Sequence, residues 1–278
     1  MNGDGRPLQC RHRSNRRLLG LAQASLSRVP ECPPLRKVLI FGDSHLAALK
    51  LGWDTQPVRP DWSIQFFGAP STSLTELRPR GDGAVFAGSD RLSYKMHALW
   101  GVSEVRPEDY DVVCVAGLSA TALSFARSVA TEHDMPLLPD ELKAAARRLV
   151  SSSLAAQTVR TVRQVTGKPI VMIETPAPGL NDDGSFRAGI PSSVESDRDA
   201  QVFSDAFLWG LRTMDGVDDV LRQPAETKAN ALFTKPEYSR GSVRLSVKSV
   251  EHGDQDRKHM NGAYGIKVLQ ALDRVVRH

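Results

Sequence analysis

The stretch Val38-Leu39-Ile40-Phe41-Gly42-Asp43-Ser44-His45 decides the fold of this chain. Residues 37–41 form a short, almost continuously apolar run, which is typical of a strand buried on both faces of a parallel sheet. Gly42 has no Cβ and therefore allows a tight turn directly after that strand. Ser44 on this turn has two interpretations. Its hydroxyl caps the next helix, or it is a nucleophile at the exposed end of the strand.

The rest of the chain alternates strands with helices. The pattern predicts further strands at 63–67, 111–115, 170–173 and 217–221. It predicts helices at 45–52, at 139–166, at 200–214 with Asp199 as the N-cap, and at the C-terminal end, where Tyr264, Val268 and Leu272 share one face. Such alternation implies right-handed crossovers, so we expect an α/β fold with a mostly parallel, five-stranded sheet.

Three of the predicted strands end next to candidate functional residues. Ser44, Gly68 and Gly117 each lie just past the end of a predicted strand. Parallel sheets bind ligands beyond the carboxyl ends of their strands. We therefore expect the functional site at this edge of the sheet.

Composition divides the chain into an arm and a body. The 278 residues are 41% hydrophobic and 24% charged, which fits one globular domain with a tail. Residues 1–36 hold seven arginines and two acidic residues, so the net charge of +4 leaves −1 for the rest. We predict a basic, disordered arm at 1–35 and a single domain at 36–278, with an insertion or a lid at 75–108. A body without net positive charge does not indicate binding to nucleic acid.

Cysteine usage and the lengths of apolar runs bear on location and cofactors. Cys10, Cys32 and Cys114 form neither a CxxC pair nor an even set, which indicates a reducing compartment without a disulfide framework or zinc site. No apolar run reaches the roughly 18 residues that a membrane span needs. The run after Arg16-Arg17 is short for a secretory signal. We expect a cytoplasmic protein without stable membrane insertion, and no metal or other cofactor, because no such binding motif occurs.

A second motif, Asp256-Arg257-Lys258-His259, precedes the C-terminal helix. A carboxylate three residues before a histidine can accept from one ring nitrogen and fix the tautomer that a general base needs. The alternative is a helix cap beside a solvated histidine. With Ser44, the motif supplies a nucleophile, an orienting acid and a base in the chain order Ser…Asp…His. The direction of His45 is expected to be wrong for proton transfer. The other histidines of the body expected to be isolated and solvated are His97, His133 and His252.

These motifs resemble those of the GDSL-type, or SGNH-fold, hydrolases. The first block looks like Phe41-Gly42-Asp43-Ser44-His45, with histidine where the family name has leucine, and the last block, D-x-x-H, matches Asp256–His259. Gly68 resembles the glycine of the second block. The third block, normally G-x-N-D, aligns with Gly117-Leu118-Ser119-Ala120, so a serine stands where the family has asparagine. The resemblance spans residues 36–278.

The resemblance implies a fold and roles for five residues. The fold is three-layered and doubly wound, of the flavodoxin-like type. Ser44 would be the nucleophile, His259 the base and Asp256 its orienter. The oxyanion hole would consist of the Ser44 and Gly68 N–H groups, with Ser119 as a third donor. Alternative third donors on the loop after Gly68 are Ser71, Thr72 and Ser73.

We therefore expect a serine hydrolase that cleaves an O-acyl ester, such as an acetyl ester, of a carbohydrate or small metabolite through an acyl-enzyme. Two alternatives stay open: an O-acyltransferase to a sugar hydroxyl, and a non-catalytic binding protein on the same fold. The serine at position 119 favours the binding protein, whereas the intact Ser-Asp-His set opposes it. Oligomeric state does not follow from the sequence.

Overall fold

The computed structural model describes residues 35–133, 137–181, 194, 196–245, 247–253 and 255–277 of the chain. The prediction for the basic arm lies outside these residues. The part Pro34–His278 forms one compact unit.

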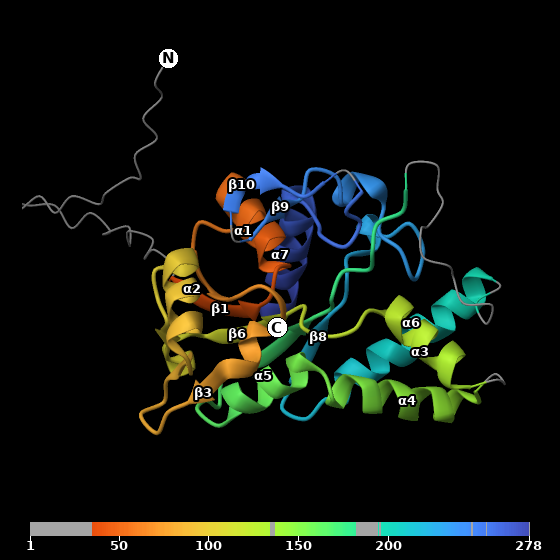
Figure 1. Ribbon diagram of the computed structural model, residues 1–278, viewed down its shortest axis with the longest axis horizontal. Helices are drawn as coiled ribbons and strands as arrows, with labels where there is room; N and C mark the ends of the chain where they lie inside the picture. Colours follow the sequence, from red (N-terminus) through yellow and green to blue (C-terminus); the bar gives the residue numbers. More distant parts are fainter. Residues whose placement is uncertain are drawn as a thin grey trace, which may run out of the picture. The chain divides into compact units, whose positions relative to one another are not determined.

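A five-stranded sheet forms the centre of this unit (Figure 1). Its strands lie in the order β2-β1-β6-β7-β8, and every neighbouring pair is parallel. This is the strand order of doubly wound, flavodoxin-like folds, so the predicted fold class is confirmed. The strands are β1 Arg36–Gly42, β2 Trp62–Gly68, β6 Val112–Ala116, β7 Ile170–Ile173 and β8 Asp219–Leu221.

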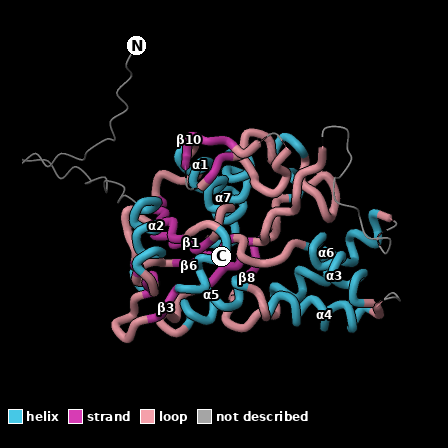
Figure 2. Tube along the Cα trace, viewed as in Figure 1, coloured by secondary structure: helices cyan, strands magenta, loops and turns pink. Residues whose placement is uncertain are grey.

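Helices cover both faces of the sheet and give three layers (Figures 1 and 2). Val38 and Ile40 of β1 face the core under α1 (Leu46–Thr55) and α7 (Gly262–Val276). Leu39 and Phe41 face the core on the other side. This alternation explains why the run before Ser44 is apolar throughout, since both of its faces are buried. The helices whose side chains enter the second core are α2 Asp90–Trp100, α3 Ala122–Glu132, α4 Pro139–Ser151, α5 Leu154–Arg163 and α6 Asp197–Arg212.

The segment 75–108, predicted as an insertion or a lid, is a folded part of the crossover between β2 and β6. Leu92 and Met96 of its helix α2 are buried in the same core as Leu39. Its strands form a small antiparallel sheet. These strands are β3 Leu77–Pro79, β4 Val85–Ala87 and β5 Glu104–Val105, and the flanking 3₁₀ helices are η1 Ser71–Glu76 and η2 Pro107–Asp109.

Two helix predictions need correction. The stretch 139–166, predicted as one helix, is divided into α4 and α5, because the Ser153 hydroxyl accepts the Ala156 N–H and starts a new helix. The N-cap of α6 is Ser196, and Asp199, predicted for that position, is its reciprocal partner in a capping box. Elements that the sequence did not predict include α3, the 3₁₀ helices η3 Ala225–Thr227 and η4 Pro236–Tyr238, and the antiparallel pair β9 Val243–Arg244 and β10 Val247–Glu251.

Helices α1 and α7 lie unusually close to each other, and Figure 1 shows them side by side above the sheet. A Cβ at Gly265 of α7 would lie 1.9 Å from the carbonyl oxygen of Ala48 in α1. Only glycine allows this approach. Because α1 follows Ser44 and α7 follows His259, this packing places the turn before α1 near the turn before α7.

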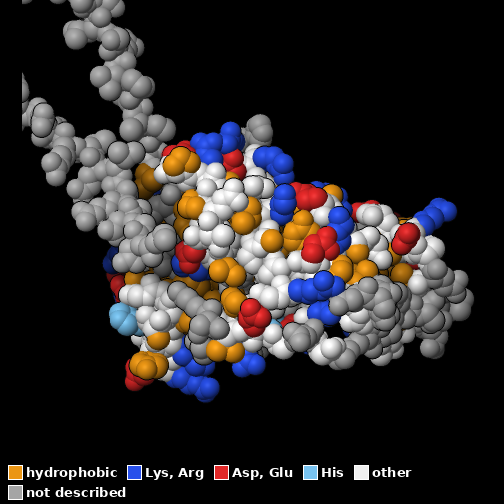
Figure 3. Space-filling model, turned by 90° about the horizontal axis from the view of Figure 1, so that it is seen from above, with side chains coloured by type: hydrophobic (Ala, Val, Ile, Leu, Met, Phe, Trp, Pro, Cys, Tyr) orange, Lys and Arg blue, Asp and Glu red, His pale blue; other side chains and the backbone are white. Residues whose placement is uncertain are grey.

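The surface of the described part carries charges of both signs. In the view of Figure 3, lysine and arginine side chains lie among acidic and hydrophobic ones. Within the described ranges, no helix has the length and apolar character that a membrane crossing requires.

Candidate functional site

Ser44 lies in the turn between β1 and α1, at the carboxyl end of the central sheet. Its Oγ is 3.0 Å from Nε2 of His259, a residue 215 positions further along the chain. Nδ1 of His259 is 2.8 Å from Oδ2 of Asp256. The structure thus joins the three residues of the two sequence motifs in one hydrogen-bonded chain.

The hydroxyl of Ser44 does not cap a helix. Helix α1 begins with His45 as its N-cap, and no side chain makes a capping hydrogen bond there. Oδ1 of Asp43 instead accepts the backbone N–H of His45 at 3.0 Å. The hydroxyl of Ser44 bonds to the ring of His259. The helix-cap interpretation of Ser44 is therefore not supported.

Asp256 is oriented by three N–H groups. Its Oδ1 accepts the backbone N–H groups of Lys258 at 2.8 Å and His259 at 3.0 Å, and its Oδ2 faces Nδ1 of the His259 ring. Burial acts to raise the pKa of Asp256, but the hydrogen bonds from His259 outweigh it and hold that pKa below its ordinary value. An ionised carboxylate at this place favours the tautomer of His259 that carries its proton on Nδ1, in which Nε2 can accept a hydrogen bond.

His252, expected from its sequence context to be isolated and solvated, instead lies against His259 and Asp256. Its ring stacks on the ring of His259 with 3.9 Å between centroids and 5° between planes. Its Nδ1 lies 3.1 Å from Oδ2 of Asp256, the oxygen that His259 also faces. The spacing of four residues from Asp256 was visible in the sequence, but the region between β10 and Asp256 gave no periodic pattern from which to place the ring.

His252, Asp256 and His259 also form a group whose potential ligand atoms lie within 4.8 Å of one another. The geometry does not suit a metal ion. The two rings are parallel and stacked, so an ion shared by them would lie between the ring planes, whereas the lone pair of an imidazole nitrogen lies in the plane of its ring. The arrangement is that of two imidazoles beside one carboxylate.

His45 also lies beside His259, with 5.7 Å between ring centroids. Its Nδ1 is buried and has no hydrogen-bond partner among the described residues. Burial lowers the pKa of His45, although the charge of Asp43 opposes this effect. The ring is therefore neutral at neutral pH, and its hydrogen bonds do not connect it to Ser44, in keeping with the expectation that it is not the base.

Gly68, predicted as an oxyanion donor, is the last residue of β2 and pairs with Gly42. A Cβ at this position would lie 1.9 Å from the carbonyl oxygen of Gly42, which is sufficient reason for a glycine. The carbonyl oxygen of Gly68 accepts the indole N–H of Trp100 at 2.6 Å. Its role as a donor stays a prediction.

Ser119, the predicted third donor, has two local partners. Its hydroxyl donates to the carbonyl oxygen of Ala120 at 3.0 Å and shares a 2.8 Å hydrogen bond with the hydroxyl of Thr175. A single hydroxyl proton is thus already used within the loop. Of the alternative donors, Thr72 is exposed and Ser73 is half-buried in η1, and the side chain of Ser71 lies outside the described part.

Asp43 ties the first and third sequence blocks together, a role that the sequence analysis did not assign. Its Oδ2 accepts the backbone N–H of Leu118 at 3.4 Å, while its Oδ1 holds the N–H of His45. Leu118 has a φ of 66°, a left-handed conformation that costs a non-glycine residue about 1 kcal/mol or more. The surrounding hydrogen bonds therefore hold a strained turn next to Ser119.

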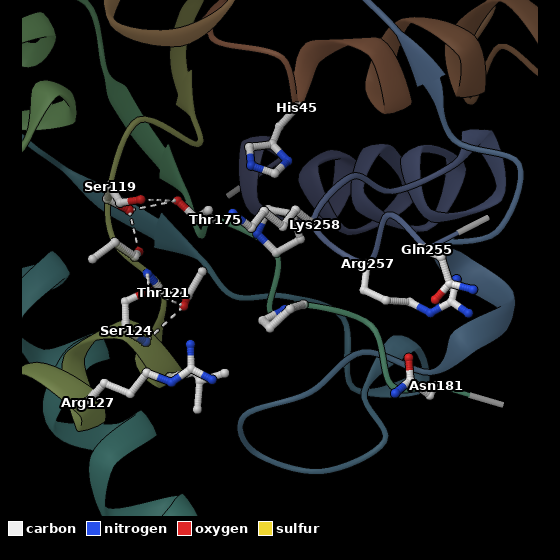
Figure 4. A pocket seen from close by; sticks show the side chains of 14 residues that line it. His45, Ser119, Thr121, Ser124, Arg127, Thr175, Asn181, Gln255, Arg257 and Lys258 are labelled. Atoms are coloured by element: carbon white, nitrogen blue, oxygen red, sulfur yellow. Dashed lines mark hydrogen bonds between the residues drawn. The ribbon is translucent and has the colours of Figure 1, made fainter. Parts of the chain in front are cut away.

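A pocket of about 460 Å³ lies over the ends of β6 and β7 and reaches His45 and Lys258, the chain neighbours of Ser44 and His259. Figure 4 shows Ser119 and Thr175 on one wall, with Arg127 below them and Arg257 and Gln255 on the opposite side. Many of the lining side chains carry hydroxyl, amide or cationic groups. They include Thr121, Ser124, Arg127, Asn181, Gln255 and Lys258.

No family model matches this chain, and neither does any curated protein. Among solved structures, the chain is similar to one described as "a putative platelet activating factor from Streptococcus pneumonia", with a TM-score of 0.41 and 14% identity. That match covers 90% of this chain and 86% of the other. A second solved structure has a TM-score of 0.38 and 14% identity, over 87% of this chain and 95% of the other. Similarities at this level carry no argument about function.

Proposed function

We propose that this protein is a carboxylic-ester hydrolase in which Ser44 is the nucleophile, His259 the general base and Asp256 the group that orients the base. The observation that carries the proposal is the hydrogen-bonded chain from Ser44 Oγ through His259 to Asp256, with distances of 3.0 and 2.8 Å. These distances lie in the range that proton transfer between a nucleophile and its base requires. The resemblance of both sequence motifs to SGNH-fold hydrolases supports the same assignment.

The reaction follows from the positions of the protons. The Ser44 hydroxyl gives its proton to Nε2 of His259 while Oγ attacks the ester carbonyl carbon, and the carbonyl oxygen becomes an oxyanion. When the intermediate collapses, the bond to the alcohol oxygen breaks and His259 returns the proton to the leaving alcohol. Water then attacks the acyl-enzyme with the same proton movements and releases the acid. Asp256 stays ionised and stabilises each imidazolium that forms.

The adjoining pocket supports a small-molecule substrate. Its volume of about 460 Å³ is in the range of small-molecule sites. Hydroxyl and amide side chains such as Thr121, Ser124 and Asn181 line it, and such groups pair well with the hydroxyls of an alcohol. We therefore propose an O-acyl ester with a short acyl group, such as acetyl, on a carbohydrate or small metabolite.

A fluorophosphonate probe tests the proposal directly, because it reacts preferentially with an activated serine. We expect labelling of the full-length protein, with mass spectrometry locating the phosphonyl group on Ser44. The labelled protein should no longer hydrolyse p-nitrophenyl acetate. Variant Ser93→Ala, which changes a serine of helix α2 outside the site, is the matched control and should be labelled as the wild type is.

If Ser44 stays unlabelled in folded protein and short acyl esters are not turned over, the hydrolase assignment is wrong. A ligand-binding protein on the same fold then becomes the better interpretation. If labelling occurs but p-nitrophenyl acetate turns over only when a sugar is added, the acyl group passes to a sugar hydroxyl rather than to water.

A further inference from the structure

His252 has no part in the proton transfers proposed above, yet it lies against both groups that serve Ser44. Its ring is parallel to the ring of His259 at 3.9 Å, and its Nδ1 is 3.1 Å from Asp256 Oδ2. It enters the site from the end of β10, whereas Asp256 and His259 belong to the turn before α7. A residue placed in this way can fix the plane of the His259 ring from the side.

We propose that His252 is a positioning residue: its neutral ring forms the platform on which His259 lies, and this contact keeps Nε2 of His259 directed at Ser44. The inference rests on the proposed role of His259 as the base. Hydrogen bonds alone leave part of the ring orientation open, because the ring can tilt about the line from Asp256 to Ser44. A flat partner at stacking distance removes that freedom, and a correctly oriented base is worth much of the rate in such sites.

The platform works only while it is uncharged. A proton on His252 would place a second positive charge next to the imidazolium that His259 forms during the reaction, and would compete for Asp256. Several titratable or charged groups surround this ring: Asp256 and His259 in contact with it, Arg244 on β9, and Arg240 and Arg257 on the wall of a cavity of about 280 Å³ that His252 also lines. His45 lies beside His259.

The balance of these groups keeps the His252 ring neutral. Burial and the charge on His259 lower the pKa of His252, and Arg244 adds to this effect, whereas Asp256 opposes it. The result is a neutral imidazole at neutral pH. A neutral ring can stack on His259 without adding a positive charge beside it.

Two variants of the full-length protein distinguish the contribution of the flat ring from that of the polar nitrogen. His252→Phe keeps a flat ring and lacks the nitrogen, whereas His252→Asn keeps an N–H group near the same place and lacks the ring. The readout is the second-order rate constant for fluorophosphonate labelling of Ser44 at about pH 8, above the ordinary pKa of an imidazole. His97→Asn, at an exposed position on α2, is the control.

We expect His252→Asn to lower the labelling rate by about tenfold, the upper end of what a stacked aromatic pair contributes, and His252→Phe to stay within about threefold of wild type. With p-nitrophenyl acetate, the loss should appear in kcat rather than in KM. If the Asn variant does not fold, His252→Leu, which fills the space without a flat ring, replaces it. Unchanged rates in both variants, equal losses in both, or a larger loss in the Phe variant would each overturn the platform.

A second measurement does not depend on catalysis. The Nδ1 proton of His259, held by Asp256, should give a downfield proton resonance in wild type and in His252→Phe, and a broadened or absent one in His252→Asn. If Ser44 of the wild type resists the probe while this resonance behaves as expected, the hydrolase proposal fails and the positioning role stands. If the resonance is the same in all three proteins, the positioning role fails whatever the labelling shows.

Discussion

The Nε2 atom of His259 lies 3.0 Å from the Oγ atom of Ser44, although 215 positions separate the two residues. Helices α1 and α7 bring them together. Each helix begins directly after its motif, and both pack on the same face of the sheet, with Gly265 against the backbone of Ala48. Two short motifs at opposite ends of the chain thus form one site because the helices that follow them are neighbours.

Replacing the proposed nucleophile should affect catalysis but not the stability of the fold. We expect Ser44→Ala to abolish both probe labelling and ester hydrolysis, since the Oγ atom that forms the bond is gone. The midpoint of thermal unfolding should stay within about 2 °C of wild type, because the hydroxyl makes no helix cap and fills little of the core. Differential scanning calorimetry checks this. A drop of about 8 °C with activity retained would mean that Ser44 is structural.

Removing either partner of Ser44 should lower the labelling rate, but the two variants should differ in the rate that remains. Asp256→Asn replaces an acceptor with an amide that favours the wrong tautomer of His259, so we expect a loss of about 10²–10⁴ in labelling rate. His259→Ala removes the proton acceptor itself, so its residual labelling rate should be lower than that of Asp256→Asn. Rates of both variants at about pH 8 decide this. If Asp256→Asn labels like wild type, the carboxylate does not orient the base.

The five parallel strands could be predicted because a strand buried on both faces is apolar throughout. Runs such as Val38–Phe41 and Ile170–Ile173 are apolar throughout, and both lie in the sheet. The break between α4 and α5 could not be predicted from the apolar stripe. It depends on the Ser153 cap and occupies only two residues, too few to interrupt the stripe visibly. The short strands β3 to β5 give too few residues for a period of two to be recognised.

Within the site, too, residues that belong to a local motif could be predicted, whereas residues that act through distant contacts could not. Ser44, Asp256 and His259 stand out because each motif carries its chemistry within a few residues. His252 does not, since its importance comes from a stacking contact made by the turn before α7 rather than from its own neighbours. The same holds for Asp43, whose second bond reaches Leu118 across 75 positions.

Ser119 offers a sharp test of the predicted oxyanion hole. Its hydroxyl already bonds to Ala120 and Thr175, so we expect Ser119→Ala to lower the labelling rate by less than about tenfold. A donor to the oxyanion would cost on the order of 10²–10³ when removed. The control is Thr175→Val, which removes the partner hydroxyl and should have a comparably small effect. A loss of a hundredfold or more in Ser119→Ala alone would make the serine a working substitute for the family's asparagine.

The last prediction concerns stability and pH. Burial lowers the pKa of His45, so below its ordinary value of 6.5 the unfolded chain binds a proton that the folded protein resists. Stability conferred by the neutral ring is therefore present above about pH 6.5 and falls as the pH drops, with a slope of up to about 1.4 kcal/mol per pH unit for one such group. Urea unfolding between about pH 7.5 and 5 measures the slope. We expect a shallower slope in His45→Gln than in wild type, and no change in His97→Gln, whose ring is exposed. Equal slopes in all three proteins would mean that His45 takes up its proton as readily in the folded state as in the unfolded one.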